Sequence, residues 1–208
     1  PAVTAAYPRL RLAFREEKTE DVLEELRSGA LDAGLLALVP ELDELAWAKI
    51  TDVPFVVAMP ATHALARKKV VDPPDLDEEN VLLLDDGHCF RTQALALCAK
   101  VGAHEADLRA TSLSTLVQMV SSGAGITLLP SMAVPVENRR AQIEVRPLGG
   151  RWPSRTIALV FRPGSPVTAA LRELARTIAR AVGAEASSAT RPRGRRRAKA
   201  LAEPRRVA

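Results

Sequence analysis

The stretch ATSLSTLVQMVSSGAGITLLP, residues 110–130, predicts a helix followed at once by a buried strand. Ser112 is suited to begin the helix, because its hydroxyl can accept a hydrogen bond from a free backbone N–H of the first turn. Four apolar residues then recur with the period of one helix face: Leu113, Leu116, Val117 and Val120. The apolar run 126–130 ends at Pro130 and predicts a strand inside a core.

The same alternation extends over most of the chain. Further helices are predicted over 1–8, 20–28 with Thr19 as the N-cap, 90–101 and 166–182. Further strands are predicted over 9–14, 30–38, 47–50, 55–59, 81–84, 143–148 and 156–161. Alternating strands and helices predict an α/β architecture with mostly parallel sheets. If such a chain folds into two α/β lobes, the cleft between them is the default ligand site.

The spacing of the strands predicts two Rossmann-like lobes joined by two crossover strands. We expect residues 1–58 and 155–184 to form lobe I and residues 59–154 to form lobe II. Residues 185–208 carry eight Lys or Arg and two Glu, which leaves a net charge of −2 on residues 1–184. We interpret this basic segment as a disordered, solvated tail. A contribution to DNA affinity by neutralising phosphates is the second interpretation.

Composition excludes several classes of protein. No apolar run is long enough to span a membrane, and the N-terminus lacks a signal pattern, so we expect a cytoplasmic protein that makes no membrane contact. Two cysteines in 208 residues are too few for a disulfide-stapled secreted scaffold. The chain begins at Pro1 without an initiator Met, and we expect a missing segment upstream.

Both cysteines lie in GHCFRTQALALC, residues 87–98. Cys89 opens the predicted helix, where the helix dipole and the neighbouring His88 and Arg91 favour the reactive thiolate over the thiol. Nine helical residues rise by about 13.5 Å and turn half a turn out of register, whereas a disulfide needs α-carbons within about 7 Å. A disulfide between Cys89 and Cys98 is therefore incompatible with an intact helix, and the pair predicts a redox switch.

Three stretches together resemble the regulatory domain of the OxyR group of peroxide-sensing LysR-type transcriptional regulators. They are GHCFRTQALALC, the helix–strand stretch from Ala110 to Pro135, and RTIALVFRPGSP, and the likeness covers residues 1–183. The resemblance implies a type 2 periplasmic-binding-protein-like fold and assembly as a homodimer or homotetramer. It also implies a DNA-binding winged helix-turn-helix upstream of Pro1, contact with RNA polymerase, and reduction by glutaredoxin- or thioredoxin-type proteins.

The resemblance assigns roles to residues of this chain. It implies that hydrogen peroxide oxidises Cys89, that Cys98 resolves the product as a disulfide, and that the peroxide pocket comprises Thr19, His88, Arg91, Gln93 and Arg155. Thr92 follows Arg91 where relatives often have an acidic residue. We therefore do not expect Arg91 to form an ion pair with the next residue.

Two other functions stay open on the residues alone. One is a LysR-type effector domain that binds a small metabolite between its lobes, with the cysteines incidental. The other is a thiol peroxidase, which is disfavoured because turnover needs a readily reduced pair such as Cys-X-X-Cys, and we therefore expect no enzyme activity. His63 and His104 have no partners at zinc spacing, so we expect neither a metal nor a cofactor.

Overall fold

The computed structural model describes residues 1–42, 44–85, 89–150 and 154–189. The helices are α1 (Ala2–Ala6), α2 (Thr19–Ser28), α3 (Cys89–Val101), α4 (Leu113–Ser121), α5 (Val134–Ala141) and α6 (Thr168–Ala189). The strands are β1 (Ala33–Ala37), β2 (Ala46–Val53), β3 (Phe55–Pro60), β4 (Asn80–Leu84), β5 (His104–Ala110), β6 (Ile126–Pro130), β7 (Ile143–Pro147) and β8 (Arg155–Phe161). Short 3-10 helices are η1 (Pro40–Leu42), η2 (Ala64–Arg67) and η3 (Pro73–Leu76).

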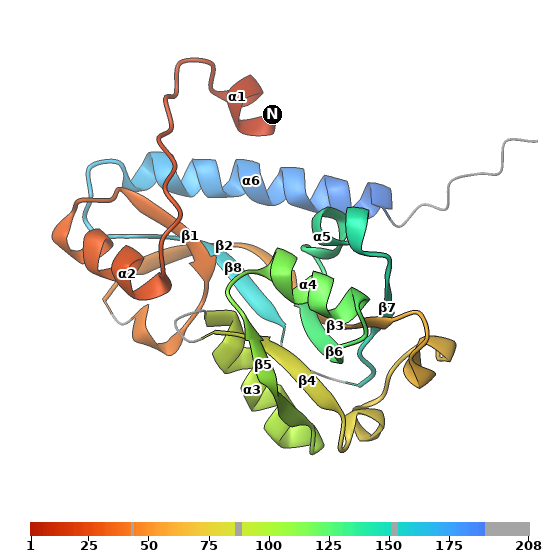
Figure 1. Cartoon of the computed structure of the whole chain (residues 1–208). Helices are drawn as coiled ribbons and strands as arrows, with labels where there is room; N and C mark the ends of the chain where they lie inside the picture. The colour runs from red at the N-terminus through yellow and green to blue at the C-terminus, as the bar shows by residue number, and fades with distance from the viewer. Residues whose placement is uncertain (43, 86–88, 151–153, 190–208) are drawn as a thin grey trace, which may run out of the picture.

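Within the described residues the strands form two sheets, one in each lobe (Figure 1). The first sheet has the order β1-β8-β2, and the second has the order β5-β4-β6-β3-β7. Val53 ends β2 in the first sheet and Phe55 begins β3 in the second. The first crossing between sheets therefore lies at Pro54, earlier than the expected boundary at 58–59. The chain is back in the first sheet at Arg155.

The expectation of mostly parallel sheets is wrong. β8 runs antiparallel to both β1 and β2, and β3 runs antiparallel to β6 and β7. Among the described strands, β4 pairs in parallel with β5 and β6, and one isolated parallel bridge joins Val71 and Leu148. Every one of these antiparallel pairs contains β3 or β8, the strands that directly follow the two crossings between the sheets.

β8 places its side chains alternately on the two faces of the first sheet, as strand geometry requires. Ala158 and Val160 join a core with α2 residues, including the fully buried Leu26. Leu159 and Phe161 join the core beneath α6. The first lobe is thus a sheet covered on one face by α2 and on the other by α6.

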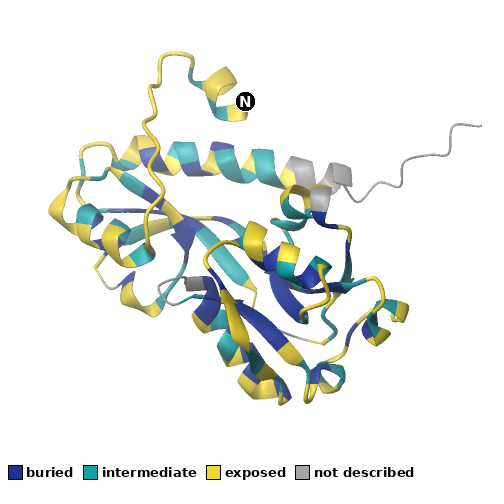
Figure 2. Cartoon of the chain, viewed as in Figure 1, coloured by how far each residue is buried: buried dark blue, intermediate teal, exposed yellow. Residues whose placement is uncertain are grey.

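The second lobe contains the larger core. β4 and β6 are buried along nearly their whole length, which Figure 2 shows as dark blue arrows. α3 and α4 add apolar residues to the same cluster: Phe90, Ala94, Leu97, Cys98, Val101, Leu116, Val117 and Val120. The continuous apolar runs that predicted these strands therefore reflect burial on both faces.

Local capping signals predicted the helix ends with mixed success. The Ser112 hydroxyl accepts a hydrogen bond from the Thr115 amide at 3.1 Å, which confirms the predicted cap of α4. Thr19 is not the N-cap of α2, because the helix already includes Thr19 and the cap residue is Lys18. α6 continues past Gly183 to Ala189, since one helical glycine costs only about 1 kcal/mol and is followed by good helix formers. The rest of the predicted tail, 190–208, lies outside the described residues.

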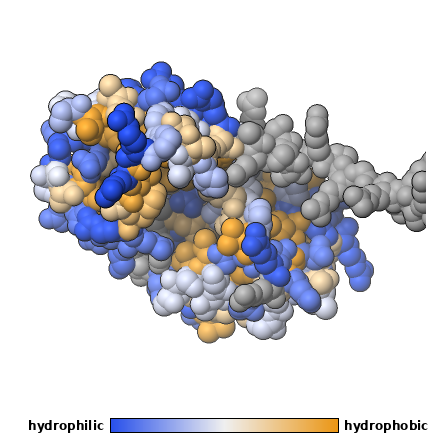
Figure 3. Space-filling view, turned by 90° about the horizontal axis from the view of Figure 1, so that it is seen from above, coloured by the Kyte–Doolittle hydropathy of each residue, from blue (hydrophilic) through white to orange (hydrophobic). Residues whose placement is uncertain are grey.

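The strand predicted over 9–14 is absent from the structure. Residues 10–18 have no regular secondary structure, and Leu10, Leu12 and Phe14 are 45%, 44% and 85% exposed. The segment runs as an exposed yellow trace toward α2 (Figure 2). On the surface seen in Figure 3, hydrophobic patches lie among hydrophilic ones. Alternating apolar residues form a strand only when a neighbouring strand pairs with them, and no described strand pairs with 9–14.

Two elements of the second lobe have no counterpart in the prediction, namely β5 and α5. β5 is an edge strand with a mostly polar sequence, HEADLRA, and α5 is short and charged, VPVENRRA. Neither carries a sustained apolar period, which is why the pattern did not reveal them. Among the described helices none combines the length and apolarity needed to cross a membrane.

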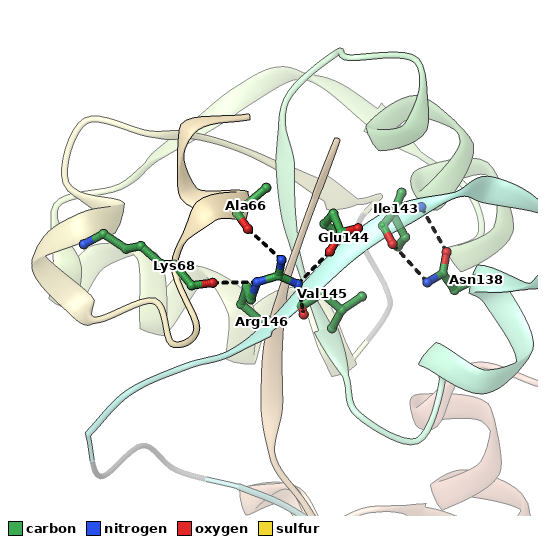
Figure 4. A network of polar contacts seen from close by, with 7 residues as sticks. All are labelled: Ala66, Lys68, Asn138, Ile143, Glu144, Val145 and Arg146. Atoms are coloured by element: carbon green, nitrogen blue, oxygen red, sulfur yellow. Dashed lines mark hydrogen bonds and ion pairs between the residues drawn. The ribbon is translucent and has the colours of Figure 1, made fainter. Parts of the chain in front are cut away.

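Arg146 on β7 fastens the loop after β3 to the second sheet (Figure 4). Its guanidinium donates to the carbonyl oxygens of Ala66 and Lys68, both at 2.6 Å, and forms an ion pair with Glu144 at 2.7 Å. The Asn138 side chain exchanges two 3.0 Å hydrogen bonds with the backbone of Ile143 and so closes the turn between α5 and β7. These bonds give hydrogen-bond partners to the carbonyl oxygens of Ala66 and Lys68 and to the backbone of Ile143.

Candidate functional site

α3 carries both cysteines on one uninterrupted helix between the parallel strands β4 and β5. Cys89 is its first residue and is described in its backbone only, while Cys98 lies in its third turn. Nine helical residues place the two positions about 13.5 Å apart along the helix axis and half a turn apart around it. The prediction that one helix holds both cysteines is confirmed. His88 lies outside the described residues.

Cys98 is a free thiol inside the core of the second lobe. It is 3% exposed and shares the inner face of α3 with Ala94 and Leu97. Burial raises the pKa of the Cys98 thiol to about 11, and the nearby carboxylate of Glu105 acts in the same direction. In this helix Cys98 is therefore protonated at neutral pH and is a poor nucleophile.

Arg91 lies buried at the start of α3 and fastens the helix to the sheet. Its guanidinium donates to the Leu84 carbonyl oxygen at the end of β4, at 3.2 Å, and to the Glu105 carboxylate on β5, at 2.7 Å. Glu105 also receives the Arg109 guanidinium at 3.0 Å. The hydrogen bond from Arg91 is the main cause that lowers the pKa of Glu105. The acidic partner of Arg91 is thus Glu105, fourteen residues further along the chain.

Phe90 makes the contact between α3 and the first lobe. Its ring lies 5.7 Å from the Phe55 ring, centre to centre, and the Arg155 guanidinium carbon lies 5.4 Å from the Phe90 ring centre. Arg155 begins β8, so the structure brings this predicted pocket residue from the other sheet to the first turn of α3. Gln93 is also on α3, and its buried side-chain oxygen has no hydrogen-bond partner among the described residues.

Thr19 belongs to the first lobe, as Arg155 does. It begins α2, which packs on β1 in the first lobe. The predicted pocket residues that the structure describes thus come from three elements: Arg91 and Gln93 from α3, Arg155 from β8 and Thr19 from α2.

Glu105 is the residue of this site that the sequence did not indicate. α3 connects the parallel strands β4 and β5, and the Arg91 side chain in its first turn reaches Glu105, the second residue of β5. A single acid in an unrecognised edge strand carries no motif. Within the described part of the chain, no group of three or more His, Cys, Asp or Glu side chains is placed to hold a metal ion.

Comparison with known proteins places this arrangement in a family. Residues 1–183 match the model of the LysR substrate binding domain. The DNA-binding transcriptional dual regulator OxyR of Escherichia coli K12 is 41% identical over 179 residues, which are 86% of this chain and 59% of that protein. The chain thus spans about three fifths of that relative.

Solved structures agree with the sequence comparison. A crystal structure of the reduced form of OxyR superposes with a TM-score of 0.78 at 39% identity, covering 86% of this chain and 84% of that one. A cysteine-to-serine mutant of Corynebacterium glutamicum OxyR with bound hydrogen peroxide gives a TM-score of 0.80 at 32% identity, covering 90% of this chain and 61% of that one. The predicted type 2 periplasmic-binding-protein-like fold is confirmed, and the chain belongs to the family of LysR substrate-binding domains, with OxyR regulatory domains as its structural neighbours.

Proposed function

We propose that this chain is the regulatory domain of a transcriptional regulator that responds to hydrogen peroxide through a Cys89–Cys98 disulfide. The observation that carries the proposal is the placement of both cysteines on α3, with Cys98 free and buried. The likeness to OxyR, including a peroxide-bound form, supports peroxide as the signal.

The first step takes place at Cys89. As the first residue of α3 it lies at the positive end of the helix dipole, which stabilises the thiolate. The thiolate attacks one oxygen of hydrogen peroxide, the O–O bond breaks, and the leaving hydroxide takes a proton to become water. Cys89 is left as a sulfenic acid, oxidised by two electrons.

The pocket for the peroxide is proposed beside the first turns of α3. The buried Gln93 oxygen can accept a hydrogen bond from a peroxide O–H, and the Arg155 guanidinium, which lies over the Phe90 ring, can donate to the departing oxygen. We assign Arg91 to holding the helix, because its guanidinium is already bound to Leu84 and Glu105. Thr19 and His88 stay candidates on the resemblance alone.

The second step needs α3 to open. The Cys98 thiolate attacks the Cys89 sulfur and expels the hydroxyl group as water, so two thiols and one peroxide yield one disulfide and two waters. The two sulfurs cannot meet on an intact helix, because about 13.5 Å of helical rise exceeds the roughly 7 Å limit between disulfide α-carbons. Opening also exposes Cys98 to water, which removes the burial that raises its pKa.

Order-of-magnitude energies make such a switch feasible. Exposing a buried side chain such as Phe90 or Leu97 costs about 1.5–3 kcal/mol. A disulfide closing a loop of about ten residues constrains the open chain by about 2.5–3 kcal/mol. Since the two free energies are comparable, oxidation by peroxide and reduction by cellular thiols can each shift the balance.

The remaining parts of this function belong to the whole protein and extend the proposal. We infer assembly as a homodimer or homotetramer, DNA binding through a domain outside this chain, contact with RNA polymerase, and reduction by glutaredoxin- or thioredoxin-type proteins in the cytoplasm. The full-length OxyR relative, described as a DNA-binding regulator, supports the DNA contact.

One experiment tests the proposal. The protein, with Cys89→Ser and Cys98→Ser alongside, is treated with stoichiometric peroxide, and its thiols are mapped by mass spectrometry. We expect a Cys89–Cys98 disulfide in the unmodified chain and a sulfenic acid at Cys89 when Cys98 is replaced. Absence of both products would favour a domain that binds a metabolite, and sustained peroxide turnover with a thiol reductant would favour an enzyme.

A further inference from the structure

Glu105 is connected to both ends of the proposed switch. Through Arg91 it holds the first turn of α3 against β5, with 2.7 Å between the guanidinium nitrogen and the carboxylate oxygen. Through its negative charge it disfavours ionisation of Cys98, two turns further along the same helix. One carboxylate on the sheet edge thus acts on the start of α3 and on its buried thiol.

The Arg91–Glu105 pair is sheltered enough to matter energetically. The Arg91 side chain is 8% exposed and the Glu105 side chain is 25% exposed. Arg91 donates in addition to the Leu84 carbonyl oxygen, so its guanidinium joins the ends of β4, α3 and β5. Removing one partner from a buried ion pair leaves the other charge poorly compensated, which is costly. That cost would fall on the closed helix, where the pair is formed.

We infer that Glu105 is a positioning residue that stabilises the closed, dithiol form of α3 through Arg91 and thereby sets the reduction potential of the Cys89–Cys98 couple. The inference rests on the proposed function. Arg91 lies between the two cysteines, so opening residues 89–98 carries it away from Glu105. The ion pair therefore stabilises the dithiol form and not the disulfide form.

The test is a redox titration of the full chain and of Glu105→Gln in glutathione buffers. The thiols are trapped and the disulfide fraction is counted by mass spectrometry. A hydrogen bond between charged groups typically contributes enough for about a tenfold change in an equilibrium. We expect Glu105→Gln to raise the ratio of disulfide to dithiol by about tenfold, a shift of about 30 mV toward more negative potential.

The matched control is Glu144→Gln. Glu144 also pairs with an arginine at 2.7 Å, on β7 at the opposite edge of the same sheet. A residue that stabilises both redox forms equally would weaken folding without moving the potential, so an unchanged potential is expected for the control. Glu105→Asp keeps the charge on a shorter side chain, and an intermediate shift is expected; it replaces Glu105→Gln if that variant does not fold.

The outcomes separate this inference from the proposed function. An unchanged potential in the Glu105 variants, or a shift no larger than the control's, overturns the role of Glu105 and leaves the disulfide intact. If the unmodified chain forms no Cys89–Cys98 disulfide, the proposed function fails and the role of Glu105 fails with it.

Discussion

The guanidinium carbon of Arg155 lies 5.4 Å from the centre of the Phe90 ring. Arg155 belongs to the first sheet and Phe90 to α3 in the second lobe, so the contact joins the two lobes at the helix that carries the cysteines. Any rearrangement of the first turn of α3 must break or move this contact. Formation of the proposed disulfide would thus also change the surroundings of Arg155 in the first lobe.

Phe90→Leu tests the strength of that junction. The variant loses the ring contacts with Arg155 and Phe55, which contribute about 1–3 kcal/mol together. We expect the free energy of unfolding of the reduced protein to fall by about that amount in urea titrations. Phe14→Leu serves as the control, because Phe14 is 85% exposed and its replacement should change stability by less than about 0.5 kcal/mol. Equal effects of the two substitutions would contradict the contact.

Alkaline pH should destabilise the reduced domain through Cys98. Burial raises the pKa of this thiol from 9.0 to about 11, so between these values the unfolded chain has released the proton and the folded chain has not. The stabilisation is complete below pH 9.0 and is lost as the pH rises toward 11. Melting temperatures of Cys89→Ser should fall across this window, and those of Cys89→Ser/Cys98→Ala should fall less. Parallel curves would refute the assignment.

Acid should act on the same helix through Glu105. Arg91 lowers the pKa of Glu105 below its ordinary value of 4.5, so the unfolded chain binds the proton first as the pH falls. The ion pair stabilises fully above pH 4.5 and loses its effect as the pH drops through the lower folded value. Glu105→Gln should therefore show a shallower loss of melting temperature below pH 4.5 than the unmodified chain. Circular dichroism at a series of pH values measures the melting temperatures. As the control, Glu144→Gln should lose melting temperature more steeply below pH 4.5 than Glu105→Gln does.

Limited digestion with chymotrypsin should cut first in the segment before α2. Leu10, Leu12 and Phe14 are exposed and lie in backbone without sheet or helix bonds, whereas Phe90 and Phe161 are 4% and 0% exposed. Proteolysis follows local opening, which is cheapest where the backbone has no partners. Mass spectrometry of the earliest fragments should place the cut within residues 10–14. Early cleavage at Phe90 would mean that α3 opens more readily than its packing indicates.

Patterns of apolar residues predicted the buried strands and helices of each lobe, whereas the edge strand β5 and the segment before α2 were not predicted correctly. The helix after Ser112 and the strand ending at Pro130 follow from a local cap and a local apolar run, so short windows of sequence contain all the information needed. β5 lacks such a run because it lies at a sheet edge with one side in water. The segment 9–14 has the right alternation, but strand formation depends on a partner elsewhere in space.

The candidate site shows the same division. The helix that carries Cys89 and Cys98 could be predicted, because a helix of thirteen residues depends mainly on its own contiguous sequence. The Arg91–Glu105 pair was not, since it depends on how α3 folds back between β4 and β5. Thr19 was assigned to the pocket by a motif match alone, because its helix belongs to the other lobe and no local pattern connects it with α3.

The burial of Cys98 also determines which reagents can reach its sulfur. The Cys98 sulfur is 3% exposed, so α3 must open locally before an alkylating agent, a metal ion or glutathione can reach it. The rate of this local opening is therefore an upper limit on the rate at which any reagent can modify the sulfur. If Cys89 is oxidised as proposed, it is already tethered to the same helix, so we expect it to react with Cys98 faster than reagents that must diffuse in from solution.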